Sequence, residues 1–249
     1  MSKWLEGRVL ENRVWTQTLF SLRVESPRLR FEAGQFVRLA LDTGGERIAR
    51  PFSFVNAPAD PVLEFYGVIV PEGPLSPPLA RLRAGDGLYI ADNPSGFLVL
   101  SEVPPAEDLW LVATGTGIAP YLSILRTDTP WQRYERVILV HAVRRAGELV
   151  YKDMIRELQA IRPQLSYISV VSRESHPESL PESLTGRIPA AIRDGRLEAA
   201  ARPISPERSQ FMLCGNPRML KDVAAELLQR GLRKNRRRTP GQITVESFW

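Results

Sequence analysis

The second half of the chain alternates apolar runs with helical patterns, and this alternation constrains the fold more than any other feature of the sequence. Each apolar run is long enough for one buried strand, and apolar residues at helical spacing follow it. Repeated strand–helix units predict a parallel sheet with helices on both faces. The expected pairs are strand 110–113 with helix 118–126, strand 137–142 with helix 149–161, strand 167–171 with a helix near 188–192, and strand 210–214 with helix 217–231. In the last helix, one apolar stripe is formed by Met219, Leu220, Val223, Ala224, Leu227 and Leu228.

Residues 6–100 instead show short strands separated by glycine, proline and asparagine. Phe20, Leu22 and Val24 alternate with polar residues, which is typical of a half-buried strand. Further strands are expected at 37–41, 62–70 and 87–91, and such spacing predicts a small antiparallel β-barrel. The expected fold is therefore an N-terminal antiparallel β-barrel domain over residues 1–102 and a C-terminal α/β domain with a parallel sheet over residues 103–249.

Composition excludes several classes of protein. The chain of 249 residues, with 43% hydrophobic and 24% charged residues, is typical of a soluble globular protein of one large or two ordinary domains. It has no run of about 18 apolar residues and no signal-peptide pattern, so we expect a cytoplasmic protein that does not enter a membrane. The one cysteine, Cys214, excludes an intramolecular disulfide and an all-cysteine iron–sulfur cluster. With only His141 and His176, we expect no protein-built metal site.

The net charge is +5, and the densest basic run is residues 233–238. One interpretation is a solvated basic face. The other is a surface that attracts an anionic partner, such as a nucleic acid, an acidic protein or a small anion.

The strand expected at 110–113 is followed by a glycine pair, Gly115 and Gly117, and by Pro120 in the first turn of the next helix. Glycines between a strand and a helix let backbone N–H groups approach a phosphate closely. The pattern is G-x-G-x-x-P, however, with Pro120 where the dinucleotide fingerprint has its third glycine. A phosphate-binding turn and a plain strand–turn–helix both remain open from this stretch alone.

Two segments of the barrel half carry candidate ligand-binding residues. The segment Arg50-Pro51-Phe52-Ser53 offers a cation, a flat ring and a hydroxyl along one strand, although an ordinary strand with an exposed arginine has the same composition. The segment 72–77 contains Gly73 and Ser76 and predicts either a phosphate-cradling turn or a helix start with Ser76 as the N-cap.

In the second half, arginines follow the ends of successive expected strands. Dinucleotide sites for NAD place a carboxylate at the end of the second strand, but this chain has Arg144 there. Arg173 follows the next strand, and Arg187 can converge on the same point. Each one alone is typical of a surface arginine, whereas the three together favour the 2′-phosphate of NADP.

Two further features concern the end of the fourth expected strand and the end of the chain. Cys214, Gly215 and Asn216 form a turn at the carboxyl edge of the sheet, where ligands bind in open α/β folds. A small buried hydrophobe is the favoured interpretation of Cys214, ahead of a nucleophile. Phe248 and Trp249 either dock on the protein's own core or stack on a bound ring.

Taken together, these segments resemble the bacterial ferredoxin (flavodoxin)–NADP+ reductases of the plant-type reductase superfamily. The likeness runs from Trp4 to Trp249 and rests on the order and spacing of its motifs. The motifs are AGQF at 33–36, RPFS at 50–53, GPLS at 73–76, TGTGIAP at 114–120, HAVR at 141–144, VSRE at 171–174, LTGRIP at 184–189, CGNP at 214–217 and the aromatic C-terminus.

The resemblance implies an FAD-binding barrel followed by an NADP-binding α/β domain. Arg50 would bind the FAD pyrophosphate, Phe52 would lie against the flavin and Ser53 near flavin N5, with Phe52 replacing the usual tyrosine of the family. The implied FAD contacts are Arg50, Pro51, Phe52, Ser53, Tyr66, Gly73, Leu75, Ser76, Thr116, Phe248 and Trp249. The implied NADP contacts are Thr114, Gly115, Gly117, Val143, Arg144, Ser172, Arg173, Arg187, Cys214, Gly215 and Asn216. The implied catalytic residues are Ser53, Cys214 and Glu246.

The implied activity is electron exchange between NADPH, which gives a hydride to non-covalently bound FAD, and a one-electron carrier, ferredoxin or flavodoxin. An acidic carrier protein is the expected partner, and the expected protein is a monomer that binds neither nucleic acid nor membrane. A reductase component of an oxygenase system is the alternative with the same domains. A basic nucleic-acid-binding protein is the alternative of another class, and it leaves the ordered motifs unexplained.

Overall fold

The computed structural model describes residues 3–174 and 182–247. Contacts divide the chain into two compact units, which are described separately here. Unit 1 comprises Met1–Val99 and Ala119–Thr127, and unit 2 comprises Leu100–Ile118 and Asp128–Trp249. Each unit contains one six-stranded sheet.

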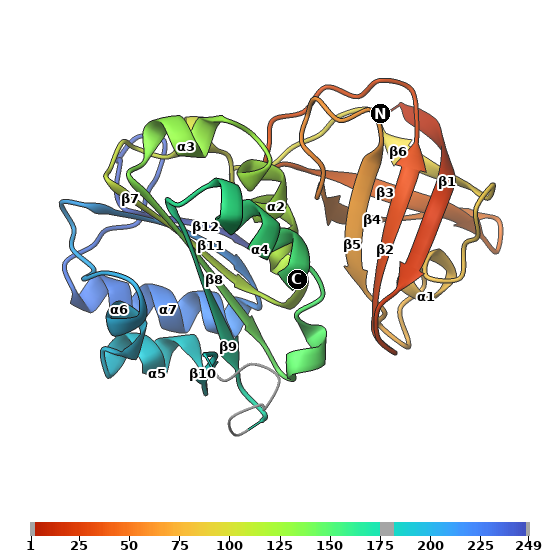
Figure 1. The fold of residues 1–249 in the computed structure, drawn as a ribbon. Helices are drawn as coiled ribbons and strands as arrows, with labels where there is room; N and C mark the ends of the chain where they lie inside the picture. Colours follow the sequence, from red (N-terminus) through yellow and green to blue (C-terminus); the bar gives the residue numbers. More distant parts are fainter. Residues whose placement is uncertain (1–2, 175–181, 248–249) are drawn as a thin grey trace. The chain divides into compact units, whose positions relative to one another are not determined.

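Unit 1 is built on an antiparallel sheet with the strand order β4-β3-β6-β1-β2-β5 (Figure 1). An antiparallel bridge between Phe54 and Phe65 joins the ends of the edge strands β4 and β5. Alternating residues such as Phe20, Leu22 and Leu39 point inward and are buried, as the sequence alternation predicts. The expected antiparallel barrel is therefore confirmed. Its elements are β1 (Trp4–Val14), β2 (Leu19–Glu25), β3 (Phe36–Thr43), β4 (Glu46–Ser53), β5 (Leu63–Val68), α1 (Ser76–Leu79) and β6 (Gly87–Ala91).

Helix α2 (Ala119–Leu125) also belongs to unit 1, although it follows the first strand of the parallel sheet in sequence. All its residues are buried. The Ser123 hydroxyl donates to the Asn56 carbonyl at 2.6 Å, and Arg126 pairs with Asp60 and Glu64 at 3.4 and 3.3 Å. From the sequence, this helix is expected in the C-terminal domain, since the contacts that connect it with the barrel join residues far apart in the chain. The functional division at residues 102 and 103 stays a prediction.

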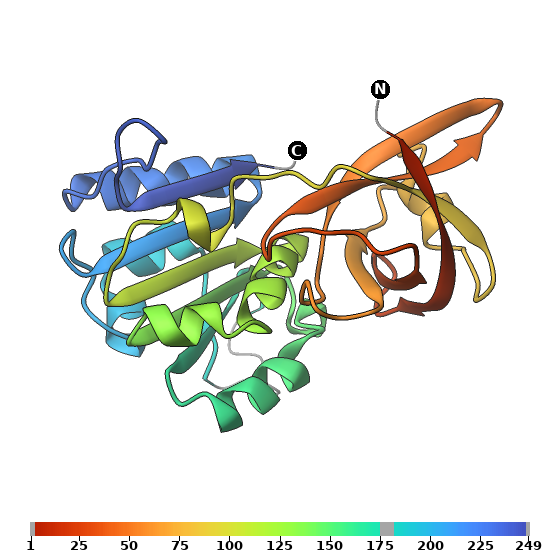
Figure 2. The ribbon, with the colours of Figure 1, turned by 90° about the horizontal axis from the view of Figure 1, so that it is seen from above.

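Unit 2 is built on a wholly parallel sheet with the strand order β10-β9-β8-β7-β11-β12. Helices α5, α6 and α7 pack on one face, while α3 and α4 lie on the other (Figures 1 and 2). This confirms the α/β sheet that the strand–helix alternation predicts. The elements are η1 (Leu100–Glu102), β7 (Asp108–Thr114), η2 (Gly115–Ile118), α3 (Thr129–Arg133), β8 (Arg136–Val143), η3 (Ala146–Glu148), α4 (Lys152–Ile161), β9 (Leu165–Val171), β10 (Leu184–Thr185), α5 (Ile188–Arg193), α6 (Arg196–Ala200), β11 (Ser209–Gly215), α7 (Pro217–Gln229) and β12 (Ile243–Ser247).

The buried stripe of α7 differs from the expected one at its end. Leu220, Val223 and Leu227 are buried, but Leu228 is 45% exposed and is wrongly included in the predicted stripe. Glu226 is buried in its place because its carboxylate pairs with Arg193 of α5. Hydrophobic periodicity cannot reveal such an ion pair with a neighbouring helix. Within the part of the chain described, no helix is both long and apolar enough to cross a membrane.

Candidate functional site

The turn after β7 is shaped by two glycines with different physical roles. Gly115 has a φ of +53°, a conformation that other residues rarely adopt. A Cβ on Gly117 would lie 2.8 Å from the Cys214 carbonyl oxygen, so this position needs glycine for space. Pro120 lies in the first turn of α2, as expected. The G-x-G-x-x-P stretch therefore forms a tight strand–turn–helix connection that packs against the end of β11.

The turn after β11 interlocks with the turn after β7. Gly215 has a φ of +127°, and a Cβ there would lie 2.2 Å from Thr114 Oγ1. The same Thr114 oxygen accepts a hydrogen bond from the Asn216 N–H at 2.9 Å. The Asn216 side chain is the N-cap of α7, since its oxygen accepts from the N–H groups of Arg218 and Met219. Thr114, Gly117 and Gly215 are therefore brought together at the carboxyl edge of the sheet.

Cys214 and Glu246 are paired in register on the neighbouring strands β11 and β12. Cys214 is fully buried, and burial together with the charge of Glu246 raises the pKa of its thiol. A thiol with a raised pKa stays protonated at neutral pH and is a poor nucleophile. This agrees with the interpretation of Cys214 as a small buried residue. Glu246 is half-buried.

The three arginines that the sequence singles out lie at the ends of neighbouring strands. The Arg173 N–H donates to the Arg144 carbonyl at 2.9 Å, which places these residues side by side after β9 and β8. The Gly186 N–H donates to the Val171 carbonyl at 2.9 Å, and Arg187 follows directly. All three arginine side chains are exposed. Within the described ranges, none of the three guanidinium groups takes part in an ion pair.

The carboxylates of Glu148 and Glu174, which lie near these arginines in sequence, accept hydrogen bonds from backbone N–H groups. Glu148 accepts from the backbone N–H of Arg144 at 3.0 Å. Glu174 accepts from the Ala146 N–H at 3.0 Å and pairs with Arg145 at 3.8 Å. Among the described residues, no carboxylate pairs with the guanidinium of Arg144, Arg173 or Arg187. Two more of the expected NADP contacts adjoin them, because the N–H and hydroxyl of Ser172 donate to the carbonyl of the buried Val143 at 3.0 and 3.1 Å.

In unit 1, the expected FAD residues Arg50, Pro51, Phe52 and Ser53 form the end of β4. Arg50 is exposed, and its Nη1 donates to its neighbour's carbonyl at 2.7 Å. Ser53 is buried. The Phe52 ring covers Gly67 on β5, where a Cβ would lie 2.8 Å from the ring. Phe52 therefore needs glycine opposite it, and the expected Tyr66 beside that glycine is buried.

The segment 73–76 does not have the helix start with Ser76 as N-cap, which was one of its two predicted structures. Leu75, not Ser76, occupies the N-cap position of α1, and Ser76 is the first helical residue. The Ser76 hydroxyl accepts from the Val70 N–H at 2.9 Å, and the Gly73 N–H donates to the Val70 carbonyl at 2.8 Å. The N-cap prediction is wrong because the hydroxyl closes the preceding turn instead. Leu75 is buried in the core as a whole residue, with 1% of its surface exposed, so the structure does not show it open to a ligand.

Of the remaining expected residues, Thr116 is half-buried within η2. Phe248 and Trp249 lie outside the described residues. His141 is named in a sequence motif but is given no role there, and its Nε2 lies 3.0 Å from the carbonyl oxygen of Gly115. A polar residue inside an otherwise apolar strand is the signal that could have identified it.

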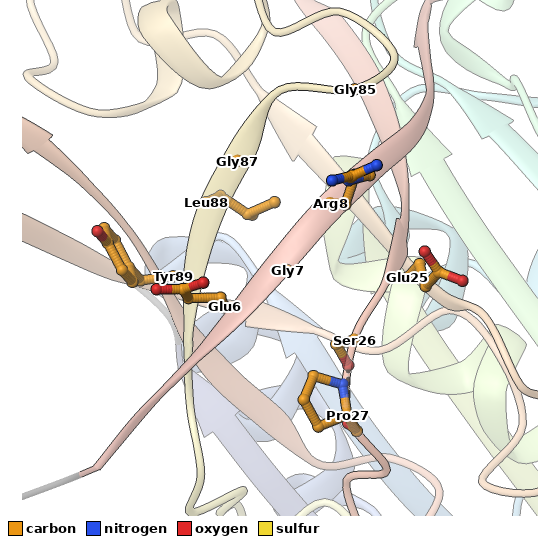
Figure 3. A pocket seen from close by; sticks show the side chains of 10 residues that line it. All are labelled: Glu6, Gly7, Arg8, Glu25, Ser26, Pro27, Gly85, Gly87, Leu88 and Tyr89. Carbon is orange, nitrogen blue, oxygen red and sulfur yellow. Dashed lines mark hydrogen bonds between the residues drawn. The ribbon is translucent and has the colours of Figure 1, made fainter.

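A surface hollow in unit 1 lies apart from all these residues. It is formed by β1, the end of β2 and β6, with Arg8, Glu25 and Tyr89 in its lining (Figure 3). Arg8 pairs in register with Glu25 on one side and Gly87 on the other. None of the residues expected to bind a cofactor lines it. It contributes nothing to the candidate site.

Comparisons with known proteins match both the arrangement and its sequence. The family model "Oxidoreductase NAD-binding domain" matches residues 111–225. The chain is 46% identical to the flavodoxin/ferredoxin–NADP reductase of Escherichia coli K12 over the full length of both chains. It is 36% identical to the ferredoxin–NADP reductase of Pseudomonas aeruginosa, covering 99% of this chain and 98% of that one. The chain belongs to the flavodoxin/ferredoxin–NADP reductase family.

Solved structures agree with this assignment to the flavodoxin/ferredoxin–NADP reductase family. A ferredoxin–NADP+ reductase from Neisseria gonorrhoeae, solved with bound FAD and NADP, has a TM-score of 0.94 at 34% identity, and each chain covers 100% of the other. The ferredoxin reductase in carbazole 1,9a-dioxygenase has a TM-score of 0.76 at 24% identity, with 70% of that chain covered. The latter shares the fold alone. The comparisons therefore favour the reductase family over the oxygenase component.

Proposed function

We propose that this chain is an FAD-dependent reductase that exchanges electrons between NADPH and a one-electron carrier, ferredoxin or flavodoxin. The observation that carries this proposal is the cluster of Arg144, Arg173 and Arg187 at one strand edge, without ion pairs among the described residues. Guanidinium groups bind phosphate by charge-assisted hydrogen bonds. Such a cluster suits the 2′-phosphate that distinguishes NADP from NAD. The full-length similarity to the reductase family supports the same conclusion.

The turns after β7 and β11 fit the rest of the nucleotide. Gly115 has a positive φ, and no atom of the described residues lies within 4 Å of its Cβ position. A phosphate or ribose can therefore approach the backbone closely. We assign Thr114, Gly115, Gly117, Gly215 and Asn216 to NADP(H), with Val143 and Ser172 beside the arginines. In this assignment the Asn216 side chain acts indirectly, by holding the start of α7.

The end of β4 fits FAD. Arg50 offers an exposed cation, and Phe52 a flat ring that β5 supports from behind through Gly67. The loop 73–76, with Tyr66, Thr116, Phe248 and Trp249, completes the proposed FAD contacts. Bound FAD would accept a hydride and release electrons one at a time.

The residues proposed to border the reacting atoms are Ser53, Cys214 and Glu246. Ser53 offers a hydroxyl at the buried end of β4. The protonated Cys214 thiol offers a neutral surface, and Glu246 pairs with it in register on β12. A neutral, buried thiol helps to exclude water from its surroundings. None of these roles requires a nucleophile, which agrees with the raised pKa of Cys214.

We further propose that the carrier is acidic and docks on the basic run 233–238. This run is exposed apart from the half-buried Asn235, and Arg237 pairs with Glu102 at 3.0 Å. Asn235 anchors the segment by donating to the Glu102 carbonyl at 2.8 Å. An anchored basic loop steers acidic proteins by long-range attraction. A monomeric state and a cytoplasmic location stay predictions, which sedimentation and cell fractionation would test.

The decisive experiment combines a spectrum with an assay of the purified protein. We expect a yellow protein that releases FAD on denaturation and that reduces ferredoxin or flavodoxin with NADPH much faster than with NADH. A protein that takes up no flavin would overturn the proposal. A flavoprotein that transfers electrons only from NADH would contradict the assignment of the three arginines.

A further inference from the structure

His141 is a buried titratable residue next to the proposed NADP(H) turn, and the proposed function gives it no role. It lies on β8, and only 1% of its surface is exposed. In the parallel sheet it pairs with Ala113 on β7 and Ser169 on β9. Because Ala113 carries only a methyl group, the larger imidazole can extend toward the turn that follows β7. The turn residue that it meets is Gly115.

The hydrogen bond between His141 and Gly115 fixes one tautomer of the imidazole. Nε2 lies 3.0 Å from the Gly115 carbonyl oxygen, which can only accept, so Nε2 must carry the hydrogen. Burial lowers the pKa of His141 to about 4 and keeps the ring neutral. Nδ1 is then a bare acceptor, and it has no hydrogen-bond partner among the described residues. The ring is therefore a neutral donor aimed at one carbonyl.

The hydrogen bond from His141 to the Gly115 carbonyl also affects the direction of the neighbouring Thr116 N–H. A peptide unit is planar and trans, so its C=O and N–H groups point in opposite directions. The Gly115 carbonyl shares its peptide unit with the Thr116 N–H. When the carbonyl is held against buried His141, the Thr116 N–H must face away from the interior of the sheet. Gly115 begins η2 with a φ of +53°, and among the described residues no atom lies within 4 Å of its Cβ position, so side-chain packing does not fix this peptide.

We propose that His141 is a positioning residue, whose Nε2–H holds the Gly115 carbonyl and thereby orients the Thr116 N–H for the bound nucleotide. This inference rests on the proposed function, which assigns Thr114, Gly115 and Gly117, on either side of Thr116, to NADP(H) and Thr116 itself to FAD. His141 itself touches neither the nucleotide nor the reacting atoms in this role. The hydrogen bond from His141 fixes the orientation of the Gly115–Thr116 peptide before the nucleotide binds.

The test compares three substitutions by steady-state kinetics with NADPH and ferricyanide. His141→Leu removes the donor, His141→Gln keeps a donor at nearly the same reach, and His141→Asn keeps one that is too short. Loss of one hydrogen bond should raise the KM for NADPH about two- to tenfold in the Leu and Asn variants, with a smaller change in kcat. The Gln variant should regain most of the wild-type KM. Titration of the flavin spectrum with NADP+ should show the same order of affinities.

A matched control is Ser169→Ala, next to His141 in register, whose hydroxyl lies 2.5 Å from that of Ser183 and does not contact the turn. This variant should lower thermal stability without changing the KM. Equal KM values for wild type and His141→Leu, or for the Gln and Asn variants, would overturn the inference. If the Leu variant fails to fold, the comparison of Gln with Asn decides.

A direct measurement on the wild-type holoprotein needs no substitution. Nitrogen-15 NMR of the imidazole should show a neutral ring with the hydrogen on Nε2, and a hydrogen on Nδ1 would overturn the inference. Failure of the proposed function would give a different experimental result. In that case, the wild-type protein itself would neither oxidise NADPH nor show a spectral response to NADP+.

Discussion

At the scale of single residues, we propose that Arg144 decides which nicotinamide coenzyme the chain prefers. It stands after β8, where a carboxylate would select NAD, and its guanidinium has no ion pair among the described residues. Arg145, one residue further, pairs with Glu174 at 3.8 Å and is the natural comparison. Among the described residues, Arg145 thus forms an ion pair with a carboxylate, whereas the adjacent Arg144 does not.

We predict that Arg144→Ala weakens the use of NADPH roughly ten- to a hundredfold, since a hydrogen bond to a charged group contributes about 1.5–3 kcal/mol. NADH lacks the 2′-phosphate, so its kcat/KM should change little. The measurement is kcat/KM with both coenzymes, and Arg145→Ala serves as the control that should retain NADPH preference. Equal losses with NADPH and NADH would remove Arg144 from the 2′-phosphate site.

His141 gives a prediction for stability against pH. Its pKa of about 4 in the folded state lies below the ordinary 6.5, so the unfolded chain takes up the proton first as the pH falls. The free energy of unfolding should therefore decrease between pH 6.5 and 4 and be unaffected by this group above 6.5. From pH 8 to pH 5 the loss is about 2 kcal/mol. Urea unfolding at both pH values should show it for the wild type but not for His141→Leu, and an equal pH response of both proteins would contradict it.

At the scale of elements, the turns after β7 and β11 are held together by close packing of glycines against neighbouring backbone atoms and Thr114. Gly117 lies against the backbone of Cys214 and Gly215, and Gly215 lies against Thr114. The two turns must therefore form together. If these turns bind NADP(H), as we propose, a methyl group at Gly117 or Gly215 should push them apart and weaken that binding.

We predict that Gly117→Ala destabilises the fold by about 1–3 kcal/mol and weakens NADP+ binding, because its Cβ would lie 2.8 Å from a backbone oxygen. Gly115→Ala meets nothing within 4 Å and should cost only about 1–2 kcal/mol for its positive φ. Gly147→Ala meets nothing within 4 Å either, and its φ is not positive, so it is the control. Urea unfolding and NADP+ titration provide the comparison. A Gly117→Ala protein as stable as the control would show that the turns can separate.

At the scale of the whole molecule, the net charge of +5 and the exposed run 233–238 predict salt-sensitive encounter with an acidic carrier. Changing Arg233, Arg236 and Arg238 to Gln should slow carrier reduction about tenfold at low salt. Above 0.1 M salt, where screening acts within about 10 Å, the difference should shrink. Three exposed arginines outside the run, Arg28, Arg81 and Arg83, form the control set. A salt response that is the same in both triple variants would exclude the run as a docking surface.

The sequence predicts most of the secondary structure but few of the contacts. Alternating or continuous apolar runs identify the strands, since burial on one or both faces leaves a pattern in the chain. Arg144, Arg173 and Arg187 were found because strand ends share one sheet edge. The bond from His141 to Gly115 and the turn closed by Ser76 were not, because each depends on which backbone group comes within reach after folding. Periodicity carries no information about such partners.

Helix α2 makes the folding of unit 1 depend on the synthesis of part of unit 2. Unit 1 is completed by Ala119–Thr127, so it cannot finish before β7, the strand that pairs with both β8 and β11, has left the ribosome. All residues of β7 except its last are buried in the finished protein, yet β11 ends only at Gly215. At about 5–20 residues per second, the nascent strand waits several seconds for that neighbour. During this interval the edge of β7 that later pairs with β11 lacks its partner, and such an unpaired apolar edge is prone to aggregation.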